Sequence, residues 1–123
     1  MSKNDETIEL RTEGPVVVAS FVKGKFQDEK QILSTLERLG KIIDSRKNVR
    51  MVLDMEQIQY LSSAGLGRLV SLLKKAMSGG GFMHLARLRP EIRELFDVMR
   101  LTQIFKIFES VESGVAAATP VTA

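Results

Sequence analysis

The chain has 123 residues and a net charge of +3, and 44% of its residues are hydrophobic and 27% are charged. These values suit one compact domain with its own core, and they exclude a nucleic-acid-binding stripe, because the 18 basic residues are dispersed among 15 acidic ones. The chain has no cysteine and no run near the roughly 18 apolar residues of a membrane helix, which excludes disulfides, thiolate metal sites and a membrane span.

Two strands are expected in the first part of the chain, after a polar start. Residues 1–6 lack the apolar core of a signal peptide, so we expect a cytoplasmic protein. Apolar and polar residues alternate over 8–10, which predicts a short edge strand. Gly14-Pro15 predicts a turn, and the β-branched run over 16–22 predicts a buried strand.

An amphipathic helix is expected over residues 28–45, with Asp28 as its N-cap. Gly40 falls within this helix and weakens the expectation that the helix is unbroken. The apolar positions, which recur at helical spacing, are Ile32, Leu33, Leu36, Leu39, Ile42 and Ile43.

The middle of the chain is expected to form a strand, a helix and a further strand. Residues 49–55 are apolar enough for a central strand, and the connection after it leads to the stretch 61–67. Gly79-Gly80-Gly81 is typical of a helix stop rather than a phosphate loop, because it precedes the strand expected over 82–88. The helix between them has apolar residues at Leu66, Leu69, Val70, Leu73 and Met77.

Three elements are expected in the last part of the chain. Pro90 suits the first turn of a third helix. Residues 104–108 alternate and predict a last short strand, and 109–118 can form a final helical segment. Residues 119–123 are expected to be a frayed tail.

This order of elements predicts an α/β fold around a largely parallel sheet, because strands alternate with helices. We expect a single domain over residues 1–123, with its core at about residues 8–118. A sheet this small leaves little room for an enclosed pocket, so we expect surface recognition of a protein partner and no cofactor.

The stretch 61–67 carries the functional signal, because two serines stand between a buried strand and a helix. Loops at the carboxyl ends of strands are where α/β proteins bind ligands and partners. A phosphate on a serine at a helix start would meet free N–H groups and the positive end of the helix dipole, and would change the surface charge by about −1.5 to −2. Gly65 and Gly67 are expected to leave backbone exposed, so that another protein can approach closely.

Several segments together resemble the signature of STAS domains. In that family an aliphatic strand ending in Asp leads to a stretch of the type Asp-Ser-Ser/Thr-Gly-Leu-Gly. The resemblance extends over roughly residues 8–118. The segments that carry it are Met51-Val52-Leu53-Asp54-Met55, the connection ending in Tyr60, Ser62-Ser63-Ala64-Gly65-Leu66-Gly67, Arg89-Pro90-Glu91 with Leu95-Phe96, and residues 105–117.

Within this family the chain is similar to the anti-sigma factor antagonists, which are regulators rather than enzymes. The resemblance implies a small mixed, largely parallel sheet of four to five strands with helices packed mainly on one face. It also implies that an anti-sigma factor serine kinase phosphorylates Ser63, that phosphorylation ends binding to this kinase, and that a metal-dependent, PP2C-type phosphatase reverses it. The residues it implies in partner binding are Asp54, Ser62, Ala64, Gly65, Leu66 and Gly67.

Departures from the family pattern keep two alternatives open. Ser62 stands where the family has an aspartate, and Ala64 replaces the Ser or Thr after the acceptor. Gln27 stands where many relatives carry an acid, although Asp28 follows at once. Ser62 is therefore an alternative acceptor, and a STAS adaptor subunit of a transporter or sensory complex, without phosphorylation, is the second hypothesis for the function.

Simpler structural roles are also open for these residues. Ser63 can be only the N-cap of its helix, and Asp54 can cap the turn after its strand. His84 is expected to be structural, because no second His and no Cys accompanies it. Leu61 stands where a hydrolase elbow requires Gly, which argues against acyl transfer. The methionines expected to fill the core are Met77, Met83 and Met99.

Overall fold

A computed structural model gives the fold, and its description covers residues 7–24 and 28–119. The polar N-terminal segment, the turn containing Gln27 and residues 120–123 of the expected tail lie outside the described residues. Within the described part of the chain, no helix is long and apolar enough to cross a membrane.

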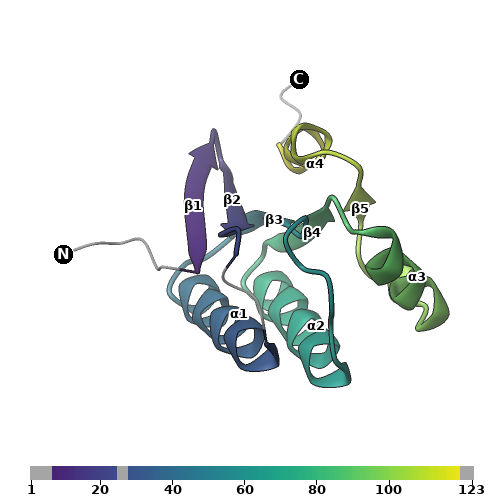
Figure 1. Cartoon of the computed structure of the whole chain (residues 1–123). Coiled ribbons are helices and arrows are strands. Elements are labelled where there is room, and N and C mark those ends of the chain that lie inside the picture. Colours follow the sequence, from purple (N-terminus) through teal and green to yellow (C-terminus); the bar gives the residue numbers. More distant parts are fainter. Residues whose placement is uncertain (1–6, 25–27, 120–123) are drawn as a thin grey trace.

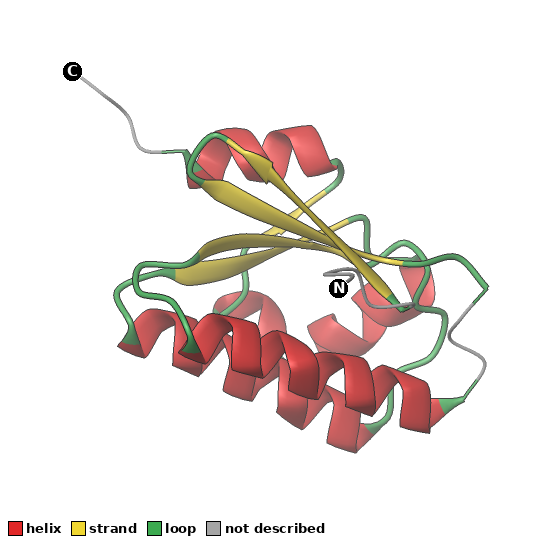
Figure 2. Ribbon diagram, turned by 90° about the vertical axis from the view of Figure 1, so that its left-hand side faces the viewer, coloured by secondary structure: helices red, strands yellow, loops and turns green. Residues whose placement is uncertain are grey.

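A five-stranded sheet forms the middle layer of the molecule (Figures 1 and 2). The strand order follows the sequence; β1 is antiparallel to β2, and every later neighbour is parallel. This confirms the expected small, mixed and largely parallel sheet. The strands are β1 (Ile8–Glu13), β2 (Val16–Phe21), β3 (Arg50–Asp54), β4 (Phe82–Ala86) and β5 (Ile107–Phe108).

In the described part of the chain, four α-helices cover the sheet, three of them on one face and one on the other (Figures 1 and 2). This agrees with the expectation that helices pack mainly on one face. Asp28 caps the first helix, as expected, by accepting a hydrogen bond from the N–H of Gln31 at 3.1 Å. On one face lie α1 (Glu29–Asp44), α2 (Ser63–Ser78) and α3 (Pro90–Val98), and on the other lies α4 (Val111–Ala118).

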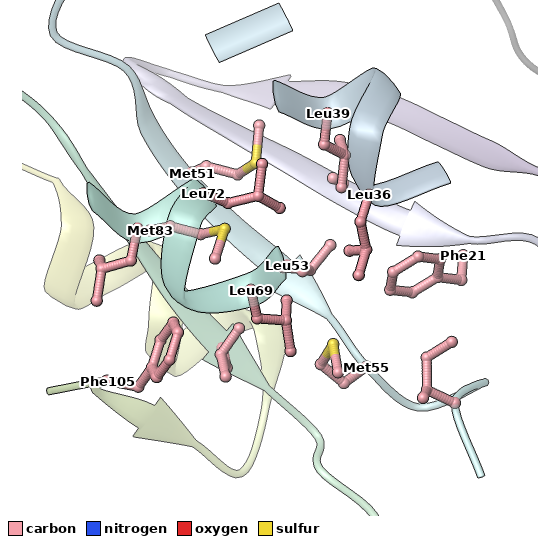
Figure 3. Packing of buried hydrophobic residues seen from close by; sticks show 14 of the residues in the cluster. Phe21, Leu36, Leu39, Met51, Leu53, Met55, Leu69, Leu72, Met83 and Phe105 are labelled. Carbon is pink, nitrogen blue, oxygen red and sulfur yellow. The ribbon is translucent and has the colours of Figure 1, made fainter. Parts of the chain in front are cut away.

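The main core lies between the sheet and α1 to α3 (Figure 3). Alternate strand residues point into it, such as Met51 and Leu53, while Val52 points to the opposite face and packs near α4. Leu36 and Leu69, from α1 and α2, are almost fully buried. Burying each such side chain stabilises the fold by about 1.5–3 kcal/mol, so this layer fixes the angle at which α1 and α2 meet the sheet.

The structure corrects three expectations. The strand expected over 104–108 is shortened to Ile107–Phe108, because residues 101–103 form a 3₁₀ turn and Phe105 packs inward against Phe96, with ring centroids 5.7 Å apart. The strand expected over 82–88 ends at Ala86. Met83 is buried as expected, but Met77 and Met99 are 60% and 54% exposed, because they lie near helix ends beyond the packed face.

Candidate functional site

The connection between β3 and α2 is held against the core by apolar side chains. Met55, Ile58 and Leu61 recur at every third residue, and all three are buried. The N–H of Met55 donates to the carbonyl of Ala86 at 2.9 Å, which ties the start of the connection to β4. Tyr60, between these anchors, is 64% exposed. The connection is therefore a fixed segment that presents selected side chains to solvent.

An ion pair holds the end of β3. The buried carboxylate of Asp54 accepts two hydrogen bonds from Arg87, at 3.1 Å from Nε and 2.6 Å from Nη2. It also accepts from the N–H of Glu56 at 3.1 Å, which is the turn-capping role that the sequence allowed. The hydrogen bond to Asp54 raises the pKa of the Arg87 guanidinium above its usual value. A direct contact between Asp54 and a partner stays a prediction.

Ser62 is the N-cap of α2, so the alternative that Ser63 is merely this cap is wrong. The Ser62 backbone is extended, and its Oγ accepts a hydrogen bond from the N–H of Gly65 at 3.1 Å. The Ser62 hydroxyl donates to the carboxylate of Glu29, in the first turn of α1. Ser62 is half-buried and links the starts of two helices.

Ser63 is the first residue of α2 and is exposed, as are Ala64 and Gly67. Residues at this position belong to the first turn, whose N–H groups have no partner within the helix. The first turn of α2, all of which is described, contains no acidic residue. A negative group on Ser63 would therefore meet the positive end of the helix dipole without an acidic neighbour in that turn.

Gly65 and Gly67 differ in what surrounds them. A Cβ on Gly65 would lie 2.7 Å from Cδ1 of Leu61, so Gly65 allows α2 to pack closely on the connection. The expectation that Gly65 leaves exposed backbone is wrong, because Gly65 is buried, and Leu66 beside it is only 6% exposed. A Cβ on Gly67 would have nothing within 4 Å. The partner-binding roles of these residues stay predictions.

A hollow of about 510 Å³ adjoins this segment. Tyr60 forms part of its wall, and Arg89 forms another part while its Nε donates to the Glu56 carbonyl at 2.6 Å. The hollow is therefore built partly from the connection that leads to Ser63. Its other lining residues are Lys23, Gly24, Asp28, Ile32, Gln57 and Gln59.

His84 is a packed core residue. Its ring stacks on Phe82, with centroids 4.4 Å apart, and lies 5.4 Å from the ring of Phe108. Burial lowers the pKa of His84, and the positive charge of Lys106 lowers it further. Among residues 7–24 and 28–119, no group of three or more His, Cys, Asp or Glu side chains could hold a metal ion. The role of His84 is therefore explained by packing.

Two residues of this site, Arg87 and Glu29, were not among the candidates from sequence. Arg87 directly follows a strand whose neighbour ends in Asp54, and the parallel register places Asp54 beside Ala86. An acid that ends one strand and a base that follows the neighbouring parallel strand are the signal for this pair. Glu29 opens α1, and only the packing of α1 beside α2 brings it to Ser62.

Comparisons with known proteins agree with this geometry. The family model described as the STAS domain matches residues 4–114. A Bordetella bronchiseptica protein named as a candidate anti-sigma factor antagonist, BtrV, is 35% identical over 68 residues, which cover 55% of this chain and 59% of that relative. The matched part thus spans less than two thirds of the relative's length.

Solved structures share the fold at lower identity. A STAS protein from Planctomyces limnophilus has a TM-score of 0.80 and 18% identity, and the match covers 90% of this chain and 97% of that one. Phosphorylated SpoIIAA from Bacillus, described as a cell fate determinant, has a TM-score of 0.69 and 15% identity, with 91% and 99% of the two chains covered. Identities this low show a common fold.

Proposed function

Because this chain belongs to the STAS domain family, we propose that it acts as an anti-sigma factor antagonist that is controlled by phosphorylation of Ser63. In this proposal it is a cytoplasmic, single-domain regulator without catalytic activity of its own. It binds an anti-sigma factor serine kinase when unphosphorylated, and a PP2C-type phosphatase restores binding after the kinase has acted. The name of the Bordetella relative supports this choice within the family.

The observation that carries the proposal is the exposed position of Ser63 at the first residue of α2. A kinase can reach a hydroxyl there without unfolding the domain. The phosphate would be stabilised by the N–H groups and the dipole of the helix, so it costs the fold little. It would still add a charge of about −1.5 to −2 to the surface, which is enough to oppose docking of a partner that fits the neutral hydroxyl.

The proposed docking surface consists of residues around Ser63 and the exposed faces of α1 and α2. These helices pack side by side (Figure 1). Ala64 and Gly67 add no bulk next to Ser63, and Gly67 has open space around it. A partner can therefore approach the backbone of the first turn of α2, and a charge on Ser63 would lie within its contact area.

Binding to the cognate anti-sigma factor kinase tests the proposal. Ser63→Asp should weaken binding by about tenfold or more, equivalent to about 1.4 kcal/mol, while far-UV circular dichroism stays unchanged. Ser63→Ala should bind like the wild type. A matched control is Ser113→Asp, because Ser113 is an exposed serine in the first turn of α4, on the opposite face of the sheet. It should leave binding unchanged.

Incubation with the kinase and ATP provides the second readout. The intact mass of the wild type should rise by one phosphoryl group, and that of Ser63→Ala should not. Equal kinase affinity of the wild type and Ser63→Asp would overturn the proposal. The same affinity together with no mass gain in the wild type would favour the adaptor function.

A further inference from the structure

We propose that Glu29 determines which of the two adjacent serines is phosphorylated, by holding the hydroxyl of Ser62 and leaving only Ser63 available. This inference rests on the proposed function, since it concerns the same phosphorylation site. Glu29 touches neither the acceptor serine nor any reacting atom, so it acts as a positioning residue.

The two serines differ in how their hydroxyl groups are used. Ser62 is half-buried; its hydroxyl hydrogen is donated to Glu29, and its oxygen accepts from the N–H of Gly65 at 3.1 Å. Ser63 is exposed, and within the described residues no side-chain hydrogen bond involves its hydroxyl. Among the residues that the structure describes, the hydroxyl of Ser62 is therefore engaged and that of Ser63 has no hydrogen-bond partner.

In phosphoryl transfer the serine hydroxyl must reach the γ-phosphate of ATP and give its proton to the base of the kinase. A bond forms between the serine Oγ and the γ-phosphorus of ATP, the bond from that phosphorus to the β-phosphate oxygen breaks to give ADP, and the hydroxyl proton passes to a base of the kinase. At Ser62, the proton is already held by Glu29 and the oxygen by Gly65. Attack by Ser62 would break both hydrogen bonds and remove the N-cap of α2, whereas attack by Ser63 breaks neither.

Electrostatic repulsion also disfavours phosphorylation of Ser62. A phosphate on Ser62 would be attached to the oxygen that contacts the Glu29 carboxylate, so two negative groups would be forced together. A phosphate on Ser63 extends from the exposed side of the helix start. The Glu29 carboxylate thus opposes the product at Ser62 as well as the reaction there.

The contact between Glu29 and Ser62 depends on the tertiary fold. Glu29 and Ser62 are 33 residues apart in sequence, and they meet because Asp28 and Ser62 cap α1 and α2 at neighbouring ends of the two helices. The local sequence at Ser62-Ser63 makes the two serines look equivalent, and α1 makes them different.

A double-mutant cycle measures the contact without a kinase. Glu29→Ala, Ser62→Ala and the double variant are compared by thermal unfolding. We expect each single variant to lower the melting temperature and the double variant to lower it by clearly less than the sum. The matched control is Glu37→Ala, which removes an acid from an exposed position of α1 and should combine additively with Ser62→Ala. Additive losses for Glu29 and Ser62 would overturn the proposal.

Mapping of the phosphorylated residue by mass spectrometry then tests the selection. After incubation with the kinase and ATP, the wild type and Glu37→Ala should carry phosphate on Ser63 alone. In Glu29→Ala phosphate should also appear on Ser62, at a share several-fold above the detection limit. Phosphate on Ser62 in the wild type, or an unchanged site in Glu29→Ala, would overturn the inference. No phosphate on either serine would instead overturn the proposed function. The double-mutant cycle would still decide whether Glu29 holds the Ser62 hydroxyl.

Discussion

At the scale of single residues, the two glycines at the start of α2 are predicted to respond in opposite ways to the same change. Gly65→Ala should destabilise the protein, because its Cβ would lie 2.7 Å from the buried Leu61 side chain. Strain of about 1–3 kcal/mol exceeds the helix propensity gained from alanine, which is at most about 1 kcal/mol. Gly67→Ala meets open space and should stabilise by about 0.5–1 kcal/mol.

Urea unfolding of both variants measures these changes. The two proteins differ from each other only in the position of one methyl group, so each is the control for the other. Equal effects of the two substitutions would show that Leu61 moves away without cost. A stabilised Gly67→Ala variant that binds the kinase less well would place Gly67 within the docking surface.

Residue roles at this site were only partly predictable from sequence. A capping serine before α2 could be predicted, since Ser, a hydrophobic helix pattern and a preceding strand are local features. Which of Ser62 and Ser63 is the cap depends on where the helix begins, and this differs by one residue between the two. The hydrogen bond from the Ser62 hydroxyl goes to Glu29, which comes from another helix. No local pattern contains that information.

At the scale of elements, the pair of Asp54 and Arg87 joins the ends of β3 and β4. Arg87 adopts a left-handed backbone conformation, with φ at 58°, although it is not glycine. That conformation costs about 1–2 kcal/mol for a residue with a Cβ, and it ends β4 after Ala86. The side chain that then folds back on Asp54 offsets this strain.

Arg87→Ala is predicted to destabilise the protein by about 2–4 kcal/mol, because it keeps the strain and leaves the buried Asp54 carboxylate without its partner. The 40% exposure of the Arg87 side chain keeps this figure below that of a fully buried pair. Arg87→Gly should be less harmful than Arg87→Ala by about 1 kcal/mol, because glycine accepts the left-handed conformation.

Chemical denaturation of these two variants and of Asp54→Asn tests the role of the Asp54–Arg87 ion pair. Glycine is normally the more destabilising of the two replacements, so the predicted order is specific to this backbone position. A larger loss for Arg87→Gly than for Arg87→Ala would contradict it. If this ion pair also positions the connection between β3 and α2, all three variants should weaken kinase binding by more than the decrease in the folded fraction explains.

The elements themselves follow closely from patterns in the sequence, and the exceptions have physical causes. The β-branched run of β2, the apolar run of β3 and the helical spacing in α1 and α2 predicted those elements to within a few residues. The last strand was overestimated because residues 104–108 alternate for another reason. Phe105 packs under α3 and Ile104 is 49% exposed, so the alternation comes from a turn at the edge of the core.

At the scale of the whole molecule, the sheet separates two unequal layers (Figure 2). The face with α1 and α2 carries Ser63 and the proposed docking surface. The other face is covered by α4, whose end is anchored by a hydrogen bond of 3.2 Å from Arg50 to the Ala118 carbonyl. His84 lies on this second side, next to Phe82 and Phe108. Changes on the α4 side can therefore alter stability without touching the proposed docking surface.

The separation of the two layers leads to a prediction about how stability depends on pH. Burial and Lys106 lower the pKa of His84 below its ordinary value of 6.5, so the folded state favours the neutral ring. The unfolded chain therefore binds a proton on His84 more readily than the folded protein does. Above pH 6.5 the ring is neutral in both states, and as the pH falls below that value the free energy of unfolding decreases. Acidification should weaken the fold through a residue that lies outside the proposed docking surface.

Urea unfolding of the wild type and His84→Gln between about pH 7.5 and about pH 5.5 measures this effect, since few other side chains titrate there. The variant removes the titrating ring, so the free energy of unfolding of the wild type should fall more steeply with acid than that of the variant. Kinase binding by the folded fraction should keep the same pH dependence in both proteins, because His84 and Ser63 belong to opposite layers. Parallel stability curves of the two proteins would show that His84 binds its proton equally well in the folded and unfolded states. A different pH dependence of kinase binding in the two proteins would show that the two layers are coupled through the sheet.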